Sequence, residues 1–247
     1  MVSTVIFAGG VGARMNSKDI PKQFLVVDGK PIIIRTLEIF DRHPQVDEIV
    51  VACLESWIPV LKEQLVQFGI RKVRSIVPGG TNGFGSIHNG LIEAAKTAQP
   101  DDLVLVCDGV RPMISEQLVS NCIQETRAFG DAVPVTPSID SLLESFDGQI
   151  TRKSYQRSTM FITQAPQGYT FRKLLWAHDE AEKRGITNPV SSCELLLELG
   201  EEVHIFQGER QNIKVTTRED LYTLRSSYYY ERYRAFAREE RNYEQND

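Results

Sequence analysis

The chain has 247 residues, of which 41% are hydrophobic and 25% are charged, and its formal net charge is −5. The composition is typical of a globular protein, and the net negative charge argues against a nucleic-acid-binding surface. No apolar run is long enough to cross a bilayer and the N-terminus has no basic leader segment. We therefore expect a cytoplasmic protein with no membrane contact.

The four cysteines are far apart in the sequence and have neither Cys-x-x-Cys spacing nor a nearby set of histidine ligands. Such a pattern predicts reduced thiols, not a zinc site or a disulfide framework. These residues are Cys53, Cys107, Cys122 and Cys193.

Apolar, β-prone segments alternate with helical patterns along the chain. Strands are expected at Val5–Ala8, Glu48–Ala52, Val73–Val77, Leu103–Cys107, Ala132–Val135, Met160–Gln164 and Val203–Gln207. Helices are expected at Ile32–Arg42, Trp57–Phe68, Ser86–Ala98, Ser115–Phe129, Tyr169–Arg184, Cys193–Leu199 and from Asp220 onward. This alternation predicts an α/β fold with a doubly wound, mostly parallel, Rossmann-like sheet. In such a sheet the ligand site lies at the carboxyl ends of the strands.

The chain shows no internal repeat and no low-complexity linker, which favours a single domain over residues 1–230 with a charged C-terminal tail at 231–247. Residues 138–160 interrupt the alternation of strands and helices. There, two strand-like runs flank Asp147-Gly148, a residue pair typical of hairpin turns. We expect a projecting β-hairpin arm that completes a site or pairs with another subunit.

A glycine-rich loop follows the first expected strand. It contains Gly9, Gly10 and Gly12, followed by Arg14 and Lys22. Glycine lets backbone N–H groups approach an anion closely, and two cations beside such a loop suit a polyphosphate. The loop matches neither a Walker P-loop nor a dinucleotide fingerprint. An ordinary turn remains an alternative, but turn geometry alone does not explain the two cations.

Three more segments follow expected strands and should reach the same sheet edge. The segment from Gly79 and Gly80 to Ser86, the expected helix cap, could pack its backbone against a nucleobase or be an ordinary turn. Asp108 follows a buried strand, where it could hold a divalent metal, bind a ribose hydroxyl or cap the next turn. Lys214 follows the last strand, as a third cation of the site or as a solvated lysine.

Cations, an acidic residue and glycine-rich backbone together indicate a site for a nucleoside triphosphate. Phosphoryl and nucleotidyl transfer depend on positioning and charge neutralisation more than on a protein nucleophile. The sequence has no Gly-x-Ser-x-Gly motif, and its four histidines lie in no recognisable motif. A phosphate monoester that attacks the α-phosphorus is already anionic and needs no general base.

These motifs, in this order, resemble those of the cytidylyltransferases that make CDP-linked sugar alcohols from CTP. That family includes the 2-C-methyl-D-erythritol 4-phosphate cytidylyltransferases and the ribitol-5-phosphate cytidylyltransferases. The resemblance covers nearly the whole chain up to about Tyr230. The motifs are A-G-G-x-G-x-R-M, P-K-Q-F, G-G…S-I-x-x-G-L, D-x-x-R-P, Q-x-P-Q and N-I-K-V-T.

The resemblance implies roles for residues in the nucleotide half of the chain. Arg14, Lys22 and Lys214 would contact the triphosphate and stabilise charge at the α-phosphorus, and Asp108 would hold Mg²⁺. The groups implied in CTP binding are Ala8, Gly9, Gly10, Gly12, Gly79, Gly80, Ser86 and Asp108.

The resemblance also implies an acceptor site that involves the arm. Arg157 matches the arginine that binds the acceptor phosphate, and Asp140 and Ser141 would belong to the same site. In the family the arm forms a homodimer, an arrangement that would let Arg157 serve the partner's active site.

Within the family, D-G-V-R-P in place of D-A-A-R-P and the segment 140–145 favour a polyol phosphate as acceptor, with D-ribitol 5-phosphate as first choice. The products would then be CDP-ribitol and pyrophosphate. 2-C-methyl-D-erythritol 4-phosphate, glycerol phosphate and a catalytically silent nucleotide-binding regulator are the alternatives. The chain also departs from the family pattern. Gly83 stands where an arginine is usual, and Asn188-Pro189-Val190 stands where acidic residues are common.

Overall fold

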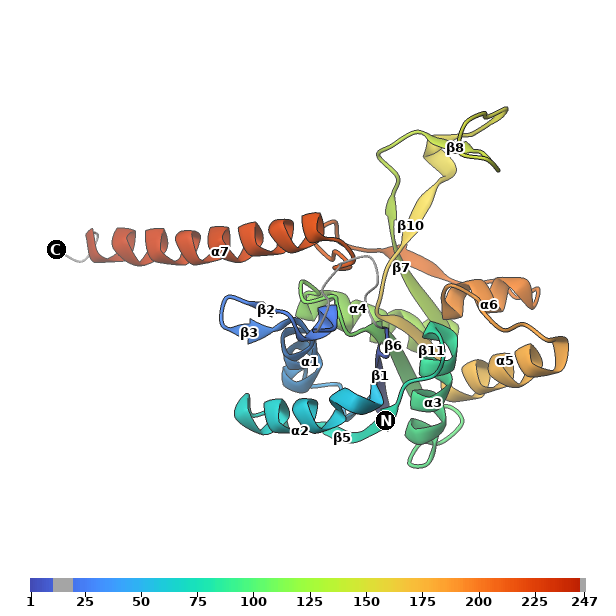
Figure 1. The fold of residues 1–247 in the computed structure, drawn as a ribbon, viewed down its shortest axis with the longest axis horizontal. Helices are drawn as coiled ribbons and strands as arrows, with labels where there is room; N and C mark the ends of the chain where they lie inside the picture. The colour runs from blue at the N-terminus through green and yellow to red at the C-terminus, as the bar shows by residue number, and fades with distance from the viewer. Residues whose placement is uncertain (11–19, 245–247) are drawn as a thin grey trace.

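The computed structural model describes residues 1–10 and 20–244, with side chains described up to Tyr230 and at Tyr233. A central sheet with helices on both faces confirms the expected α/β fold (Figure 1). Its strands are β1 (Val2–Ala8), β4 (Glu48–Cys53), β5 (Val73–Pro78), β6 (Leu103–Asp108), β7 (Asp131–Pro137), β10 (Phe161–Thr163), β11 (Gln167–Thr170) and β12 (Ile205–Gln207). The helices are α1 (Ile32–Arg42), α2 (Ile58–Gln67), α3 (Gly83–Ala95), α4 (Glu116–Phe129), α5 (Phe171–Arg184), α6 (Ser192–Glu198) and α7 (Arg218–Glu244). Among the described helices, none is long and apolar enough to span a membrane.

The strand order is β10-β7-β11-β6-β1-β4-β5, with β12 paired to β7. Strands β6, β1, β4 and β5 are mutually parallel, so their carboxyl ends meet at one edge. Because β6 and β4 flank β1 on opposite sides, the chain crosses in both directions from β1. An open sheet binds ligands at such a point.

The other half of the sheet departs from the prediction in two places. The strand expected at 160–164 is β10, but it runs antiparallel to β7. The helix expected from Tyr169 begins at Phe171, because β11 occupies Gln167–Thr170 and pairs antiparallel with both β6 and β7. Thr170 caps the helix by accepting the N–H of Lys173 at 3.3 Å, and Tyr169 is fully buried in the core.

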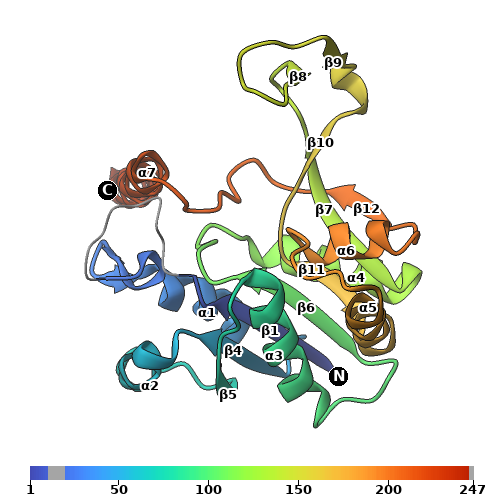
Figure 2. The same cartoon turned by 45° about the vertical axis from the view of Figure 1, so that its right-hand side comes forward.

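Alternating side chains of the strands supply two separate cores, one on each face of the sheet. In β6, Leu103, Leu105 and Cys107 pack with α1, α2 and α4, whereas Val104 and Val106 pack with α3, α5 and α6. Figure 2 shows the second group of helices on the nearer face. This two-sided burial explains why the parallel strands read as continuous apolar runs.

The arm leaves the body through β7 and β10 and ends in the strand pair β8 (Leu142–Glu144) and β9 (Lys153–Tyr155) (Figure 1). The predicted hairpin is present, but Asp147-Gly148 does not form a tight turn between its strands, because residues 145–152 separate β8 from β9. The Asp147 carboxylate accepts the N–H groups of Gln149 and Ile150, both at 2.9 Å, and so stabilises a wider loop. The short helix η4 (Arg157–Thr159) follows on the return.

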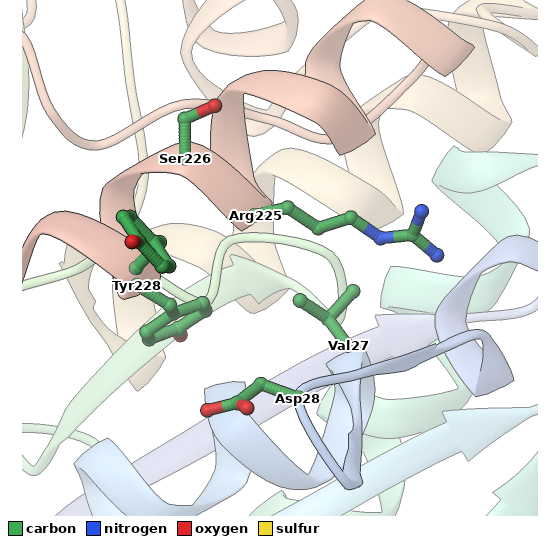
Figure 3. A pocket seen from close by; sticks show the side chains of 6 residues that line it. Val27, Asp28, Arg225, Ser226 and Tyr228 are labelled. Atoms are coloured by element: carbon green, nitrogen blue, oxygen red, sulfur yellow. The ribbon is translucent and has the colours of Figure 1, made fainter. Parts of the chain in front are cut away.

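Helix α7 packs its first turns on the small hairpin of β2 (Val26–Val27) and β3 (Lys30–Pro31). The helix expected from Asp220 onward is α7, which begins at Arg218 and continues to Glu244, so the charged segment predicted as a C-terminal tail is helical from residue 231 to Glu244. Between α7 and the hairpin lies a groove of about 450 Å³, where residues of α7 face Val27 and Asp28 (Figure 3). Among the described residues, its lining includes neither Asp108 nor any residue of the two glycine segments.

Candidate active site

The first residues of the glycine-rich segment, Ala8 to Gly10, are held in place by a buried glutamine. The Gln23 side chain, 1% exposed, donates to the carbonyl oxygens of Ala8 at 2.7 Å and Gly10 at 3.2 Å. It belongs to the short helix η2 (Lys22–Phe24), which therefore places Lys22 beside the loop. The motif P-K-Q-F contains Gln23, but an amide carries no charge that indicates a phosphate site, so the sequence alone does not reveal its role.

The second glycine segment packs directly against the first. A Cβ atom on Gly9 would lie 2.7 Å from Ser86 Oγ, and one on Gly80 would lie 2.4 Å from the carbonyl carbon of Gly85. Neither site has room for a side chain, so these glycines allow a close approach of backbone to backbone. The two loops thus form one continuous wall.

Ser86 is not the cap of α3, contrary to the prediction. The helix begins three residues earlier, and the carboxamide oxygen of Asn82 accepts the N–H of Gly85 at 2.8 Å. The Ser86 hydroxyl accepts the N–H of Gly80 at 3.0 Å and donates to the carbonyl oxygen of Asn82 at 2.8 Å. It therefore braces the loop from inside.

Asp108 ends β6 and lies between two cations. Its carboxylate contacts Lys214 Nζ at 2.6 Å through one oxygen and Arg111 Nε at 2.9 Å through the other. Arg111 also donates to the carbonyl oxygen of Asn212 at 3.0 Å. The segment after β12 is thereby fixed against the loop after β6, and Lys214 reaches the same sheet edge as Lys22, as expected.

The cations determine the charge state of Asp108. Burial would raise the pKa of this carboxyl, but the positive charges of Arg111 and Lys214 outweigh burial and hold the pKa below its usual value. The carboxylate is therefore ionised at neutral pH. Arg111 appeared in the motif without an assigned role, since its partner could not be identified before the fold was known.

A cavity of about 390 Å³ lies over these elements. Its wall includes the predicted residues Ala8, Gly9, Gly10, Lys22, Ser86, Asp108 and Lys214, together with Thr81, Asn82 and Gly83. Gly79 packs behind this wall, where a Cβ atom on it would lie 3.0 Å from the Cα atom of Gly9. Gly80 is held by the hydrogen bond of its N–H to Ser86. The predicted residues Gly12 and Arg14 lie outside the described residues.

A second cavity, of about 230 Å³, adjoins the first and shares Phe7, Asp108 and Lys214 with it. Its remaining wall comes from β11 and the residues just before it, from the start of α6, and from Ile87, Val106 and Arg111. Two buried glutamines line it, Gln164 and Gln167. Two adjoining cavities with a charged common wall can hold two substrates whose reacting groups meet at that wall.

The predicted acceptor residues lie elsewhere. Asp140, Ser141 and Arg157 are exposed on the arm, which projects from the body of the fold (Figure 2), and none of the three lines either cavity. The Arg157 guanidinium donates to the carbonyl oxygen of Ile139 at 3.3 Å. Within one chain the fold therefore brings the nucleotide residues together but not the arm residues.

Asp108 is also the residue that could hold a metal ion. The described residues contain no group of three histidine, cysteine or acidic side chains suited to a metal. Mg²⁺ is nevertheless often bound by one or two carboxylates plus substrate phosphates and water, and an ionised Asp108 at the cavity wall fits that mode.

The model of one protein family, 2-C-methyl-D-erythritol 4-phosphate cytidylyltransferase, matches residues 2–228. The chain belongs to this family. It is accordingly a nucleotidyltransferase that uses CTP. Two of the motifs on which the family resemblance was based, D-x-x-R-P and N-I-K-V-T, meet in the structure through the contacts of Asp108 with Arg111 and Lys214.

Relatives with two different names cover almost the same length. A ribitol-5-phosphate cytidylyltransferase of Streptococcus agalactiae is 38% identical over 224 residues, covering 91% of this chain and 93% of the relative. A 2-C-methyl-D-erythritol 4-phosphate cytidylyltransferase of Geobacter metallireducens is 37% identical over 221 residues, covering 89% and 94%. A solved 4-diphosphocytidyl-2C-methyl-D-erythritol synthase of Anaerococcus prevotii shares the fold, with a TM-score of 0.76, 24% identity and coverage of 92% and 95%.

Proposed function

We propose that the enzyme transfers CMP from CTP to D-ribitol 5-phosphate and produces CDP-ribitol and pyrophosphate. The observation that carries the proposal is the pair of adjoining cavities with Asp108 and Lys214 in their common wall. CTP would occupy the larger cavity, between the two glycine loops. The polyol phosphate would occupy the smaller one.

In this arrangement the chemistry takes place at the common wall. A phosphate oxygen of the acceptor attacks the α-phosphorus of CTP, a new P–O bond forms, and the bond to the bridging oxygen breaks to release pyrophosphate. Lys214 lies where it can neutralise the charge that develops at the α-phosphorus. Lys22 and Arg14 would neutralise the charge of the triphosphate. Cytosine would be recognised by the backbone of the wall from Ala8 to Gly10 and of the Gly79–Gly80 loop, which Ser86 holds rigid.

Mg²⁺ is part of this proposal, with Asp108 as its protein ligand. When bound, it would offset negative charge on the phosphate oxygens. Arg111 keeps Asp108 ionised and correctly turned toward the cavity, because it contacts one carboxylate oxygen from a buried position. The other carboxylate oxygen contacts Lys214 at 2.6 Å, so Mg²⁺ would take the place of Lys214 there and Lys214 would turn toward the phosphates.

A homodimer formed through the arm would complete the acceptor site. The arm exposes apolar side chains, among them Ile139 at 59%, Leu143 at 62% and Phe146 at 97%. A second copy would cover such surface and bring Arg157, Asp140 and Ser141 to the partner's cavity. We also propose a cytoplasmic location, in accord with the four free, buried cysteines.

The acceptor could alternatively be 2-C-methyl-D-erythritol 4-phosphate, since a relative with that activity in its name is almost as similar. The loop D-G-V-R-P and the segment 140–145 favour ribitol 5-phosphate. A third candidate, glycerol phosphate, carries a shorter chain than a five-carbon polyol.

The test is a pyrophosphate-release assay with each acceptor and each of the four ribonucleoside triphosphates. We expect the highest kcat/KM with CTP and D-ribitol 5-phosphate, and far lower turnover with ATP, GTP or UTP. A polar wall matched to one base leaves groups unpaired with the others. Higher kcat/KM with 2-C-methyl-D-erythritol 4-phosphate would assign the alternative acceptor, and comparable use of all four triphosphates would contradict the cytosine site.

A further inference from the structure

In the proposed function, the reaction determines which end of the second cavity holds the acceptor phosphate. The acceptor phosphate must lie at the common wall of Asp108 and Lys214, because only there can it reach the nucleotide. The polyol chain then extends toward the opposite wall, which is formed by Gln167 and the start of α6. Any group on that wall that is free to hydrogen-bond decides which hydroxyl pattern is accepted.

Both glutamines of this wall already have partners. Gln167 Oε1 accepts the Tyr169 hydroxyl at 2.9 Å and the N–H of Cys193 at 3.2 Å. Gln164 Nε2 donates to the carbonyl oxygen of Glu209 at 2.8 Å, and its Oε1 accepts the Glu209 N–H at 3.0 Å. These amides hold the wall together and have little capacity left for a substrate.

Ser192 differs from them. Its side chain is 3% exposed, it lines the second cavity, and its Oγ has no hydrogen-bond partner among the described residues. A buried hydroxyl without a partner is costly, and a ligand hydroxyl in the cavity would supply both a donor and an acceptor. The neighbouring Ser191 differs because it already has a partner: it caps α6 by accepting the N–H of Glu194 at 3.1 Å.

The loop that carries this wall is tied to the nucleotide site. The Asn82 side chain caps α3 and also donates to the carbonyl oxygen of Thr187 at 2.9 Å. The segment Asn188-Pro189-Val190, where the chain departs from its family's pattern, lies between this anchor and Ser192. Val190 also lines the second cavity. The departure therefore lies at the wall that faces the polyol.

We propose that Ser192 is an acceptor-binding residue that determines specificity, through a hydrogen bond between its hydroxyl and one hydroxyl group of the acceptor polyol. This inference rests on the proposed function, because it places the polyol chain in the second cavity. The ligand class is a linear polyol phosphate with a hydroxyl within reach of the start of α6.

The test compares wild type with Ser192→Ala in pyrophosphate release, with CTP and D-ribitol 5-phosphate varied in turn. We expect the KM for the acceptor to rise about tenfold, while the KM for CTP changes less than about twofold. A series of monodeoxy ribitol 5-phosphates then identifies the contact. With one of these analogues, the wild type should show about the same rise in acceptor KM that Ser192→Ala shows with D-ribitol 5-phosphate. With that same analogue, the acceptor KM of Ser192→Ala should rise no further.

Thermal unfolding separates binding from a structural role. Removal of an unpaired buried hydroxyl should leave the Tm unchanged or raise it, whereas loss of a structural hydrogen bond would lower it. Thr4→Val is the matched control, because Thr4 also has a buried hydroxyl without a partner among the described residues but lies in β1 and lines neither cavity. It should leave the KM for the acceptor unchanged.

Two different failures can be told apart. If the wild type turns over a polyol phosphate and Ser192→Ala has the same acceptor KM, Ser192 does not bind the polyol but the proposed function stands. If the acceptor KM of Ser192→Ala rises further with every deoxy analogue, the Ser192 hydroxyl makes no specific contact with any of the removed hydroxyl groups. If no polyol phosphate supports pyrophosphate release from CTP, the proposed function and the role of Ser192 both fail.

Discussion

The strand-end site and the arm obtain their order in opposite ways. At the strand ends, Asp108 and Gln23 are buried, and each polar group is held by neighbours of the same chain. On the arm, Arg157 and its neighbours are exposed, and the Arg157 guanidinium donates to a backbone carbonyl oxygen of the arm itself at 3.3 Å. The first region is preorganised for charge, whereas the second depends on another molecule for its partners.

The difference suggests that catalytic rate and acceptor affinity reside in separate parts of the molecule. Substitutions at the strand ends should lower kcat, because preorganised charges act most strongly on the transition state. Substitutions on the arm should change KM for the acceptor and leave nucleotide use intact.

The largest expected effect is that of Lys214→Ala. We expect kcat to fall about 100-fold or more, with a smaller change in KM for CTP, because a contact that strengthens in the transition state is lost mainly from kcat. Lys22→Ala should behave in the same way. Lys183→Ala, which removes an exposed lysine paired with Glu180, is the control. An unchanged kcat combined with weaker CTP binding would make both lysines contributors to ground-state binding alone.

The next effect concerns stability at acid pH. His178 stacks on Phe84 in the first turn of α3 with ring centroids 4.6 Å apart, and its ring nitrogens have no partner among the described residues. Burial, with a smaller contribution from His88, lowers the pKa of His178 to about 3. The unfolded chain takes up this proton near pH 6.5 but the folded chain does not, so the stability contributed by neutral His178 above that pH is lost as the pH falls.

At pH 5 this loss should amount to about 2 kcal/mol relative to pH 7. His178→Phe keeps the stack on Phe84, so the difference in unfolding free energy between the two pH values should shrink by about that amount. Glu144→Gln on the arm is the control. Hydrogen bonds from Tyr155 and Lys153 keep the pKa of Glu144 below its usual value, so this substitution should leave the difference in unfolding free energy between pH 7 and pH 5 nearly unchanged. Urea unfolding at both pH values measures the change, and equal differences in wild type and His178→Phe would contradict it.

Arg157→Ala tests the arm. We expect the KM for the acceptor to rise about tenfold or more and the KM for CTP to stay nearly unchanged, because a guanidinium grips a phosphate through two parallel hydrogen bonds. Arg157→Lys should restore only part of the affinity. Arg152→Ala removes another exposed arginine of the arm and should have no effect. An unchanged acceptor KM in Arg157→Ala would leave that residue an ordinary surface arginine.

The parallel half of the sheet could be predicted from the sequence because its strands are buried on both faces and followed by glycines and charged residues. Strand β11 could not, since Gln167 and Thr170 carry no β-strand pattern and Tyr169 suits a helix or a strand equally. Its burial between β6 and β7 is a property of the assembled fold. The same holds for Asn82 as the cap of α3, which replaced the equally plausible Ser86.

The positions of Asp108 and Lys214 at one cavity could be predicted because their residue types themselves indicate phosphate chemistry, and their roles stay predictions. Gln23, Arg111 and Ser192 were missed because their importance depends on what they contact. Gln23 acts through two carbonyl oxygens of the neighbouring loop, and Ser192 is informative only because its hydroxyl is buried without a partner among the described residues. Such information exists only in three dimensions.

The smallest expected effect concerns two glycines and separates the room available for a side chain from the backbone conformation that glycine allows. A Cβ atom on Gly83 would meet nothing within 4 Å, whereas one on Gly80 would collide with Gly85. Gly83 also begins α3, so Gly83→Ala should raise the free energy of unfolding by about 0.5 kcal/mol by restricting the unfolded chain. Gly69 is equally open but has φ of +68°, so Gly69→Ala should instead destabilise the protein by about 1 kcal/mol. Denaturant unfolding of both variants checks the pair. A loss of stability in Gly83→Ala would mean that the loop requires glycine at position 83 for its conformation, as it requires Gly80 for close packing.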